Sequence, residues 1–422
     1  MGSMLVSKIQ EKTIEAINRF GNYLGLDLKY YIKNSAYLLA EYVVTTAFGA
    51  LLSIALARVL TLRVYGEYNF LMSILGILAI FTLPAMNSSM VQAISRGYDG
   101  VLSTGTKERL KWSTIGTVTI LGLGVYYYLS GSVLLGVCLM CSSIIFPFYN
   151  SFVSYRTLFT AKRRFNEAAK YGAITHLIAI PITILVTYLT GNLVLIIIAY
   201  FASFSLLRGY LYRVASRNMQ NKDIDKEAIP FGRHLTVTEI PGIIAEHYDK
   251  LIIALFLSFP EVAVYSVALV FSNLLNPLRS VIPSLIFPKL SQMDRDTAYA
   301  EVKKRWPFVT LGFAIVCGIL ILLCPYVIPL LYSQKYVSSI SYAQLLLISI
   351  ILTAPLPIFN KALFLSQKEL GKLYKVRIFH AVVEITLMTA LTWTMGILGA
   401  VIAKMLTRFF LFLYELRLIR ES

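Results

Sequence analysis

The chain has 422 residues, of which 57% are hydrophobic and only 14% are charged, and its mean hydropathy is +0.69. This composition excludes a soluble globular protein and indicates a membrane protein with many spans. The net charge of +17 does not indicate nucleic acid as a partner, because the Lys and Arg residues are spread over many separate segments. We therefore expect a lipid bilayer around the chain and no nucleic acid.

Apolar stretches long enough to cross a hydrocarbon core of roughly 30 Å recur twelve times along the chain. Most of the 39 Lys and Arg residues lie in the two termini and in every second gap between these stretches. Cationic loops stay on the cytoplasmic side of a membrane. The pattern predicts an all-α polytopic protein of the cytoplasmic (inner) membrane, with about twelve spans and both termini in the cytoplasm.

The spans divide into two lobes of six. Residues 5–24 are basic and amphipathic, so we expect them to lie along the inner membrane surface. Because each half has an even number of spans, both halves have the same orientation, and a central cavity between them is expected. The predicted units are a cytoplasmic N-terminal segment 1–33, an N-lobe 34–212, a cytoplasmic inter-lobe linker 213–235, a C-lobe 236–418 and a cytoplasmic tail 419–422.

Span seven carries the most charge. An ionisable residue at bilayer depth costs about 2.5–3.5 kcal/mol and is normally paired or faces a wet cavity. Glu239, Glu246 and Lys250 lie on one stripe of this helix, with Asp249 beside it. Two interpretations are open. Glu246 and Lys250 neutralise each other and fasten the span to a neighbour, or the acidic residues bind H⁺ or Na⁺ and couple it to transport.

Further polar residues lie in or beside other spans. In span eight, Pro277 frees a backbone carbonyl among polar and cationic side chains, which suits an anion. Two arginines frame the outer end of span one, where the positive-inside rule does not expect them. The candidate substrate-binding residues are Arg279, Lys250, Arg58, Arg63, Lys404, Asn273 and Asn276, and the candidate ion-coupling residues are Glu239, Glu246, Asp249, Glu41 and Glu384.

Motifs of catalysis do not stand out in the sequence. There is no Walker lysine after a Gly-rich loop, no HExxH and no GxSxG. The pair Asp223 and Asp225 has the spelling of a sugar-nucleotide metal motif, but it lies in the linker without a βαβ pattern around it. We expect no metal, no cofactor and no enzymatic activity.

Two blocks resemble a known family. Residues 57–60 followed by 65–68, and residues 246–257 leading into 261–268, are similar to the Wzx-like polysaccharide (lipid-linked oligosaccharide) exporters. These belong to the multidrug/oligosaccharidyl-lipid/polysaccharide (MOP) exporter superfamily. The sequence departs from the family pattern at Thr61, where a glycine is usual.

The resemblance implies a V-shaped pair of six-helix bundles that opens alternately to each side of the membrane. The implied activity is the flipping of an undecaprenyl- or other polyprenyl-pyrophosphate-linked oligosaccharide to the outer leaflet, for O-antigen, capsule or exopolysaccharide synthesis. Arg279 and Lys250 would contact the pyrophosphate, with Arg58 toward the outside. The implied partners include H⁺ or Na⁺ and the polysaccharide polymerase machinery.

Two other functions are kept as alternatives. The first is a drug or cation antiporter of the same superfamily, which an anionic cavity would favour over a cationic one. The second is a membrane-embedded glycosyltransferase or polymerase, which would need a large outward loop or a metal-binding acid pair at the membrane face. The outward loops of this sequence are short.

Overall fold

The computed structural model describes residues 28–420, except 277, 279–289, 291, 292, 354–356, 358, 361, 362 and 365–368. Side chains are described from residue 36 onward, except also those of 295, 296, 305, 352, 370, 419 and 420. The amphipathic segment expected at 5–24 and the candidate Arg279 lie outside the described residues. Within them, every regular element is an α-helix or a short 3₁₀-helix.

Six long helices build the N-lobe. The turns between them follow the local sequence: Thr61 caps a helix by accepting the Val64 N–H, and Asn192 caps another in the same way. Gly191 ends the preceding helix in the left-handed conformation, at φ 58°. The long helices are α2 (Leu28–Val59), α3 (Leu62–Leu78), α5 (Val101–Leu129), α6 (Val133–Ser151), α8 (Phe165–Thr190) and α9 (Leu193–Arg217).

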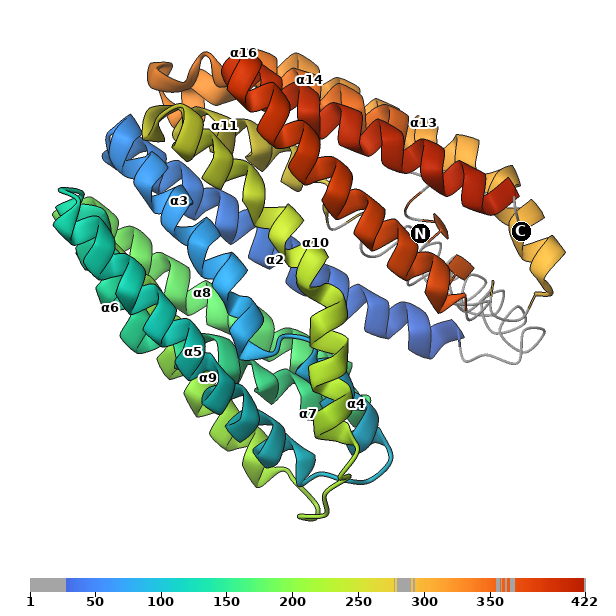
Figure 1. The fold of residues 1–422 in the computed structure, drawn as a ribbon. Coiled ribbons are helices and arrows are strands. Elements are labelled where there is room, and N and C mark those ends of the chain that lie inside the picture. The colour runs from blue at the N-terminus through green and yellow to red at the C-terminus, as the bar shows by residue number, and fades with distance from the viewer. Residues whose placement is uncertain are drawn as a thin grey trace, which may run out of the picture.

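Four short helices complete the N-lobe. They are η1 (Ala79–Thr82), α4 (Met86–Ser95), η2 (Phe152–Ser154) and α7 (Tyr155–Ala161). In Figure 1, α4 and α7 lie at one end of the lobe, beside the beginning of α10 (Ala228–Phe256). The Ser89 hydroxyl donates to the Ala228 carbonyl there, so the first helix of the C-lobe begins against the N-lobe.

The C-lobe also supplies six spans. After α10 come α11 (Phe259–Asn273), α13 (Arg295–Tyr332), η3 (Gln334–Tyr336), α14 (Ser339–Thr353) and α16 (Leu370–Arg420). α16 reverses direction at Gly396, whose φ of 65° and ψ of −143° are not helical. Phe379 and Tyr414, on either side of this turn, stack with ring centroids 4.3 Å apart. The two arms of α16 are therefore antiparallel spans, and the prediction of twelve spans is confirmed.

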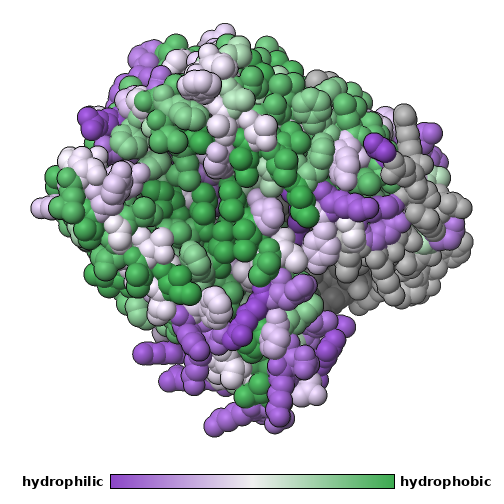
Figure 2. Space-filling model, in the orientation of Figure 1, coloured by the Kyte–Doolittle hydropathy of each residue, from purple (hydrophilic) through white to green (hydrophobic). Residues whose placement is uncertain are grey.

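The exterior suits a bilayer. Seven of the described helices are long and apolar enough to cross a membrane. Large hydrophobic side chains such as Leu206, Phe308 and Trp393 are about three-quarters exposed, which lipid would cover. Figure 2 shows hydrophobic residues over much of the surface and hydrophilic residues gathered at its lower end. This distribution is expected for a chain surrounded by lipid between two aqueous phases.

The two lobes diverge from one end, as the prediction of a V shape required (Figure 1). They meet at an inter-lobe junction, which we define as the end of α2 and start of α3 against the start of α11, the end of α13 and η3. Gly66 of α3 faces the Phe259 backbone so closely that a Cβ atom at residue 66 would overlap the Phe259 carbonyl. Glycine is required for this approach of the two lobes.

Candidate functional site

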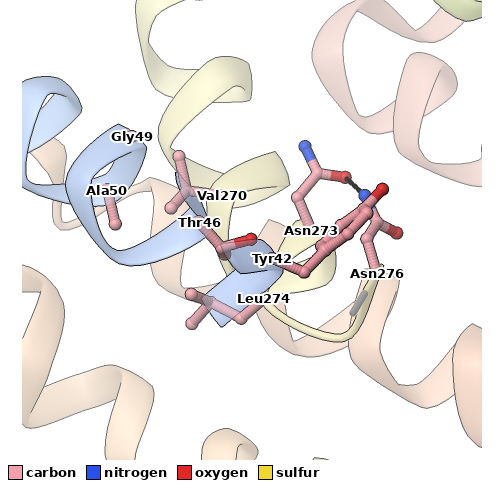
Figure 3. A pocket seen from close by; sticks show the side chains of 8 residues that line it. All are labelled: Tyr42, Thr46, Gly49, Ala50, Val270, Asn273, Leu274 and Asn276. Atoms are coloured by element: carbon pink, nitrogen blue, oxygen red, sulfur yellow. Dashed lines mark hydrogen bonds between the residues drawn. The ribbon is translucent and has the colours of Figure 1, made fainter. Parts of the chain in front are cut away.

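A polar cavity separates α2 from α11 on the line where the two lobes face each other. Its volume is about 290 Å³. Figure 3 shows Tyr42, Asn273 and Asn276 on the same side of it, and the Asn276 amide donates to Asn273 Oδ1 at 3.4 Å. The structure thus places the candidates Asn273 and Asn276 at one cavity. The remaining lining residues are Thr46, Gly49, Ala50, Val270 and Leu274.

Three candidate charges meet inside the C-lobe instead of at this cavity. Lys404 Nζ lies 2.8 Å from Glu384 Oε1 and 3.1 Å from Asp249 Oδ2. The Tyr265 hydroxyl donates to the same Asp249 oxygen at 3.0 Å. Glu384 and Asp249 are almost completely buried. We call Asp249, Tyr265, Glu384 and Lys404 the C-lobe charge cluster; it joins α10, α11 and both arms of α16.

The cluster changes the interpretation of span seven. Asp249, which has no partner nearby in the sequence, is held by Lys404 from span twelve and also accepts the Lys250 backbone N–H at 2.8 Å. Glu246 is exposed, and the structure shows no ion pair between Glu246 and Lys250 among the described residues. The ammonium of Lys404 therefore lies between Asp249 and Glu384, two of the five acidic residues expected to bind a coupling cation.

Two further acidic candidates have arginine partners. Glu239 is more than one-third exposed, and its Oε1 lies 4.0 Å from Arg377 Nη1. Glu41 is buried, and both its carboxylate oxygens accept from Arg156, at 2.5 and 2.9 Å. Gly172 of α8 lies against the Glu41 carboxylate and leaves room for it. Neither residue belongs to the C-lobe charge cluster.

Sequence reasoning missed Arg156. It lies on α7, in one of the cationic segments between spans whose charges predict the topology. The signal that could have found it is Glu41 itself, because a buried carboxylate within a span requires a cation from a neighbouring segment.

Arg58 lies at the inter-lobe junction. Its Nε–H donates to the Leu331 carbonyl at 2.7 Å, and its Nη2 donates to the Leu330 carbonyl. In return, Lys335 Nζ lies 3.2 Å from the Leu60 carbonyl at the end of α2. Each lobe thus caps the free carbonyls at a helix C-terminus of the other, which is where a cation is most favourable. Arg63 lies outside this exchange, largely exposed and 3.2 Å from Glu67.

The membrane-spanning helices of the described residues, arranged as two lobes, define a polytopic helical membrane protein. Residues 55–341 match the family model described as "Polysaccharide biosynthesis protein". That match covers more than half of the chain, and the chain belongs to this family.

Solved structures share the fold at low sequence identity. The lipid II flippase MurJ in an inward closed conformation is 14% identical, with a TM-score of 0.70 over 90% of this chain and 87% of that one. The eukaryotic MATE transporter AtDTX14 is 14% identical, with a TM-score of 0.67 over 93% and 96% of the two chains. An outward-facing multidrug resistance MATE transporter of the MOP superfamily is 16% identical, with a TM-score of 0.63 over the same shares. No curated protein matches the sequence significantly.

Proposed function

We propose that this protein is a flippase that moves a polyprenyl-pyrophosphate-linked oligosaccharide from the cytoplasmic to the outer leaflet of the inner membrane. The carrying observation is the combination of membership in the polysaccharide biosynthesis family with a polar cavity between two membrane-spanning lobes. A glycan headgroup is too polar to cross hydrocarbon, so it requires such a polar path, while a polyprenyl tail can stay in lipid. The protein acts as a transporter and not as an enzyme, and it hands its product to the polysaccharide polymerase machinery.

Alternating access would use the inter-lobe junction as its outer gate. The contacts of Arg58 and Lys335 hold this end together, whereas Figure 1 shows the lobes diverging toward the other end. With both termini cytoplasmic, as the topology predicts, the junction faces outward. Opening the gate would break both sets of carbonyl contacts and release the two cations at the exit.

The coupling ion would be H⁺ or Na⁺. Asp249 and Glu384 already share Lys404, so an added cation has to compete with a fixed ammonium there. Glu246 and Glu239 are the more accessible acids on α10. We propose that these two bind the ion, while the C-lobe charge cluster holds α10 against α16. Unchanged gradient dependence after Glu239→Gln and Glu246→Gln together would contradict this assignment.

The function is tested with purified protein in liposomes that contain a fluorescent polyprenyl-pyrophosphate oligosaccharide. Flipping is measured as loss of protection from a membrane-impermeant quencher. We expect protein-dependent flipping, with no flipping in protein-free liposomes. The same vesicles loaded with a lipophilic cation test the alternative: cation transport without glycan-lipid flipping would identify a drug or cation antiporter.

A further inference from the structure

A buried arginine in the N-lobe has no carboxylate partner among the described residues. Arg109 of α5 is only 2% exposed. Its guanidinium donates to the Thr82 carbonyl at 2.8 Å, the Asn150 carbonyl at 2.8 Å, Asn87 Oδ1 at 2.6 Å and Ser154 Oγ at 3.1 Å. All four acceptors are neutral. The hydrogen bonds hold the guanidinium in place, but its positive charge is not cancelled by them.

A second arginine binds the neighbouring carbonyl. Arg208 of α9 donates to the Tyr149 carbonyl at 2.7 Å and lies over the Tyr149 ring, 4.3 Å from its centroid. The carbonyls of Tyr149 and Asn150 belong to the last turn of α6, so Arg208 and Arg109 both cap this helix. A helix C-terminus carries about half of one negative charge. The two positive charges of Arg109 and Arg208 exceed the partial negative charge of the helix end, so a net positive potential remains.

Arg156 brings the third positive charge to the surface of a small pocket. The pocket, of about 210 Å³, is lined by Arg156, Asn87, Ser88, Thr157 and Thr160, with Val91 and Val153. Glu41 occupies two of the five N–H donors of Arg156. The other three have no partner among the described residues, and the side chain is 37% exposed.

The nearby acidic residues do not neutralise this group. Of Arg109, Arg156 and Arg208, only Arg156 pairs with a carboxylate among the described residues, that of Glu41. The N-lobe acids Asp99, Glu108 and Glu167 pair instead with Lys162, Arg233 and Arg164. Arg208 is within electrostatic range of Arg109, and both Arg208 and Arg156 are within range of His176. Three arginines and one carboxylate leave two positive charges in excess in this part of the N-lobe, where Arg156 lines the pocket and Arg109 contacts its lining residue Asn87.

We propose that this N-lobe pocket binds the diphosphate of the lipid-linked substrate, an inference that rests on the proposed function. The planar guanidinium of Arg156 matches two phosphate oxygens. The hydroxyls of Ser88 and Thr160 add donors, and Arg109 fixes the amide of Asn87 from behind. Glu41 holds Arg156 when the pocket is empty and competes with the phosphate oxygens for its N–H groups.

The position of the pocket suits the entry of the substrate. It lies between α4 and α7, at the end of the N-lobe away from the inter-lobe junction (Figure 1). By the predicted topology this end faces the cytoplasm, where the substrate begins its path. A phospholipid headgroup carries the same phosphate chemistry, so the experiment has to separate the two sources.

Competition by Glu41 gives the test a distinctive signature. Binding of farnesyl diphosphate to the full-length protein in detergent is measured by isothermal titration calorimetry, for the wild type, Arg156→Ala, Arg156→Lys and Glu41→Gln. We expect Arg156→Ala to weaken binding at least ten-fold, Arg156→Lys to weaken it less, and Glu41→Gln to tighten it several-fold. A purely structural Glu41–Arg156 pair would instead lose affinity in both single variants.

The pair Arg164 and Glu167 supplies a matched control, because it is also an Arg–Glu ion pair but does not line the pocket. Arg164→Ala and Glu167→Gln should leave the affinity within two-fold of wild type. Circular dichroism and thermal melting of each variant confirm that it is folded. Absence of diphosphate binding by the wild type, or equal binding by Arg156→Ala, overturns the proposal.

Competition with phosphatidylglycerol separates the two phosphate sources. Displacement of farnesyl diphosphate only by a large excess of phosphatidylglycerol supports the substrate site. Equal affinity for both ligands would reassign the pocket to a lipid headgroup. Diphosphate binding that depends on Arg156, in a protein that flips no glycan lipid, would retain the site and reject the proposed function. Flipping of glycan lipid that persists in Arg156→Ala would reject the site and retain the proposed function.

Discussion

Lys404 Nζ lies 3.1 Å from Asp249 Oδ2, although 155 residues separate the two in the chain. The ammonium is also 2.8 Å from Glu384, so one cation from the last span is shared by carboxylates on two other spans. The contact joins α10 to both arms of α16. A single side chain therefore holds together three helices of the C-lobe.

We expect Lys404→Met to lower the free energy of unfolding by about 3–5 kcal/mol, because it leaves two buried carboxylates without their shared partner. Glu384→Gln should cost less, since the amide keeps an acceptor oxygen for Lys404. Both are measured by titrating the purified protein from mild detergent into a denaturing one. Equal losses for the two variants would show that Lys404 is not the centre of the cluster.

Arg58→Ala should shift the protein toward a conformation that is open at the inter-lobe junction. The substitution removes two hydrogen bonds from a charged donor to the end of α13, each worth about 1.5–3 kcal/mol. Ser53 of α2 accepts from the Tyr332 hydroxyl of α13 at 3.3 Å across the junction. A Ser53→Cys reporter, in a background without other cysteines, would then react at least ten-fold faster with a membrane-impermeant thiol reagent. Arg63→Ala, a change at an exposed arginine close by, should leave that rate unchanged.

Gly66→Ala should weaken the same junction by sterics instead of charge. The added methyl group overlaps the Phe259 carbonyl, and overpacking of this kind costs about 1–3 kcal/mol. Gly122→Ala is the matched control, because a Cβ atom at residue 122 meets no atom within 4 Å. Thermal melting should show a lower transition temperature for the first variant and an unchanged or higher one for the second.

The double variant Asn273→Ala and Asn276→Ala should slow glycan-lipid flipping. Loss of two amide contacts to a polar headgroup corresponds to about 1–3 kcal/mol, or roughly five- to 150-fold in rate. The liposome assay measures it, with Asn166→Ala as a control outside the cavity. An unaffected rate would place the path of the headgroup away from α11.

Much of the fold could be predicted from the sequence because each membrane span is identified by the residues within it and directly beside it. Length and apolarity identify each span, and the distribution of Lys and Arg orders them, so no knowledge of tertiary contacts is required. Gly396 shows the limit of this reasoning: spans eleven and twelve could be counted, but the non-helical backbone of this one residue, which reverses the chain between them, could not be predicted.

The candidate site was predictable only in part. Buried charges were identifiable one by one, since ionisable residues within spans are costly and conspicuous. The residues with which these charges pair could not be identified from the sequence. Asp249 and Lys404, like Glu41 and Arg156, lie more than 100 residues apart, and no periodicity in the sequence links them.

The sequence by itself determined the class of protein, the number of spans and the division into two halves, because each depends on the hydropathy and charge of short segments. Only the tertiary structure decided which charges neutralise one another and which remain in excess. It places Lys404 between Asp249 and Glu384 and Arg58 on the helix end across the junction, and it leaves Arg109 and Arg208 without a carboxylate partner among the described residues. The physical reason is that Coulomb interactions depend on distance in space, which only the packing of the helices fixes.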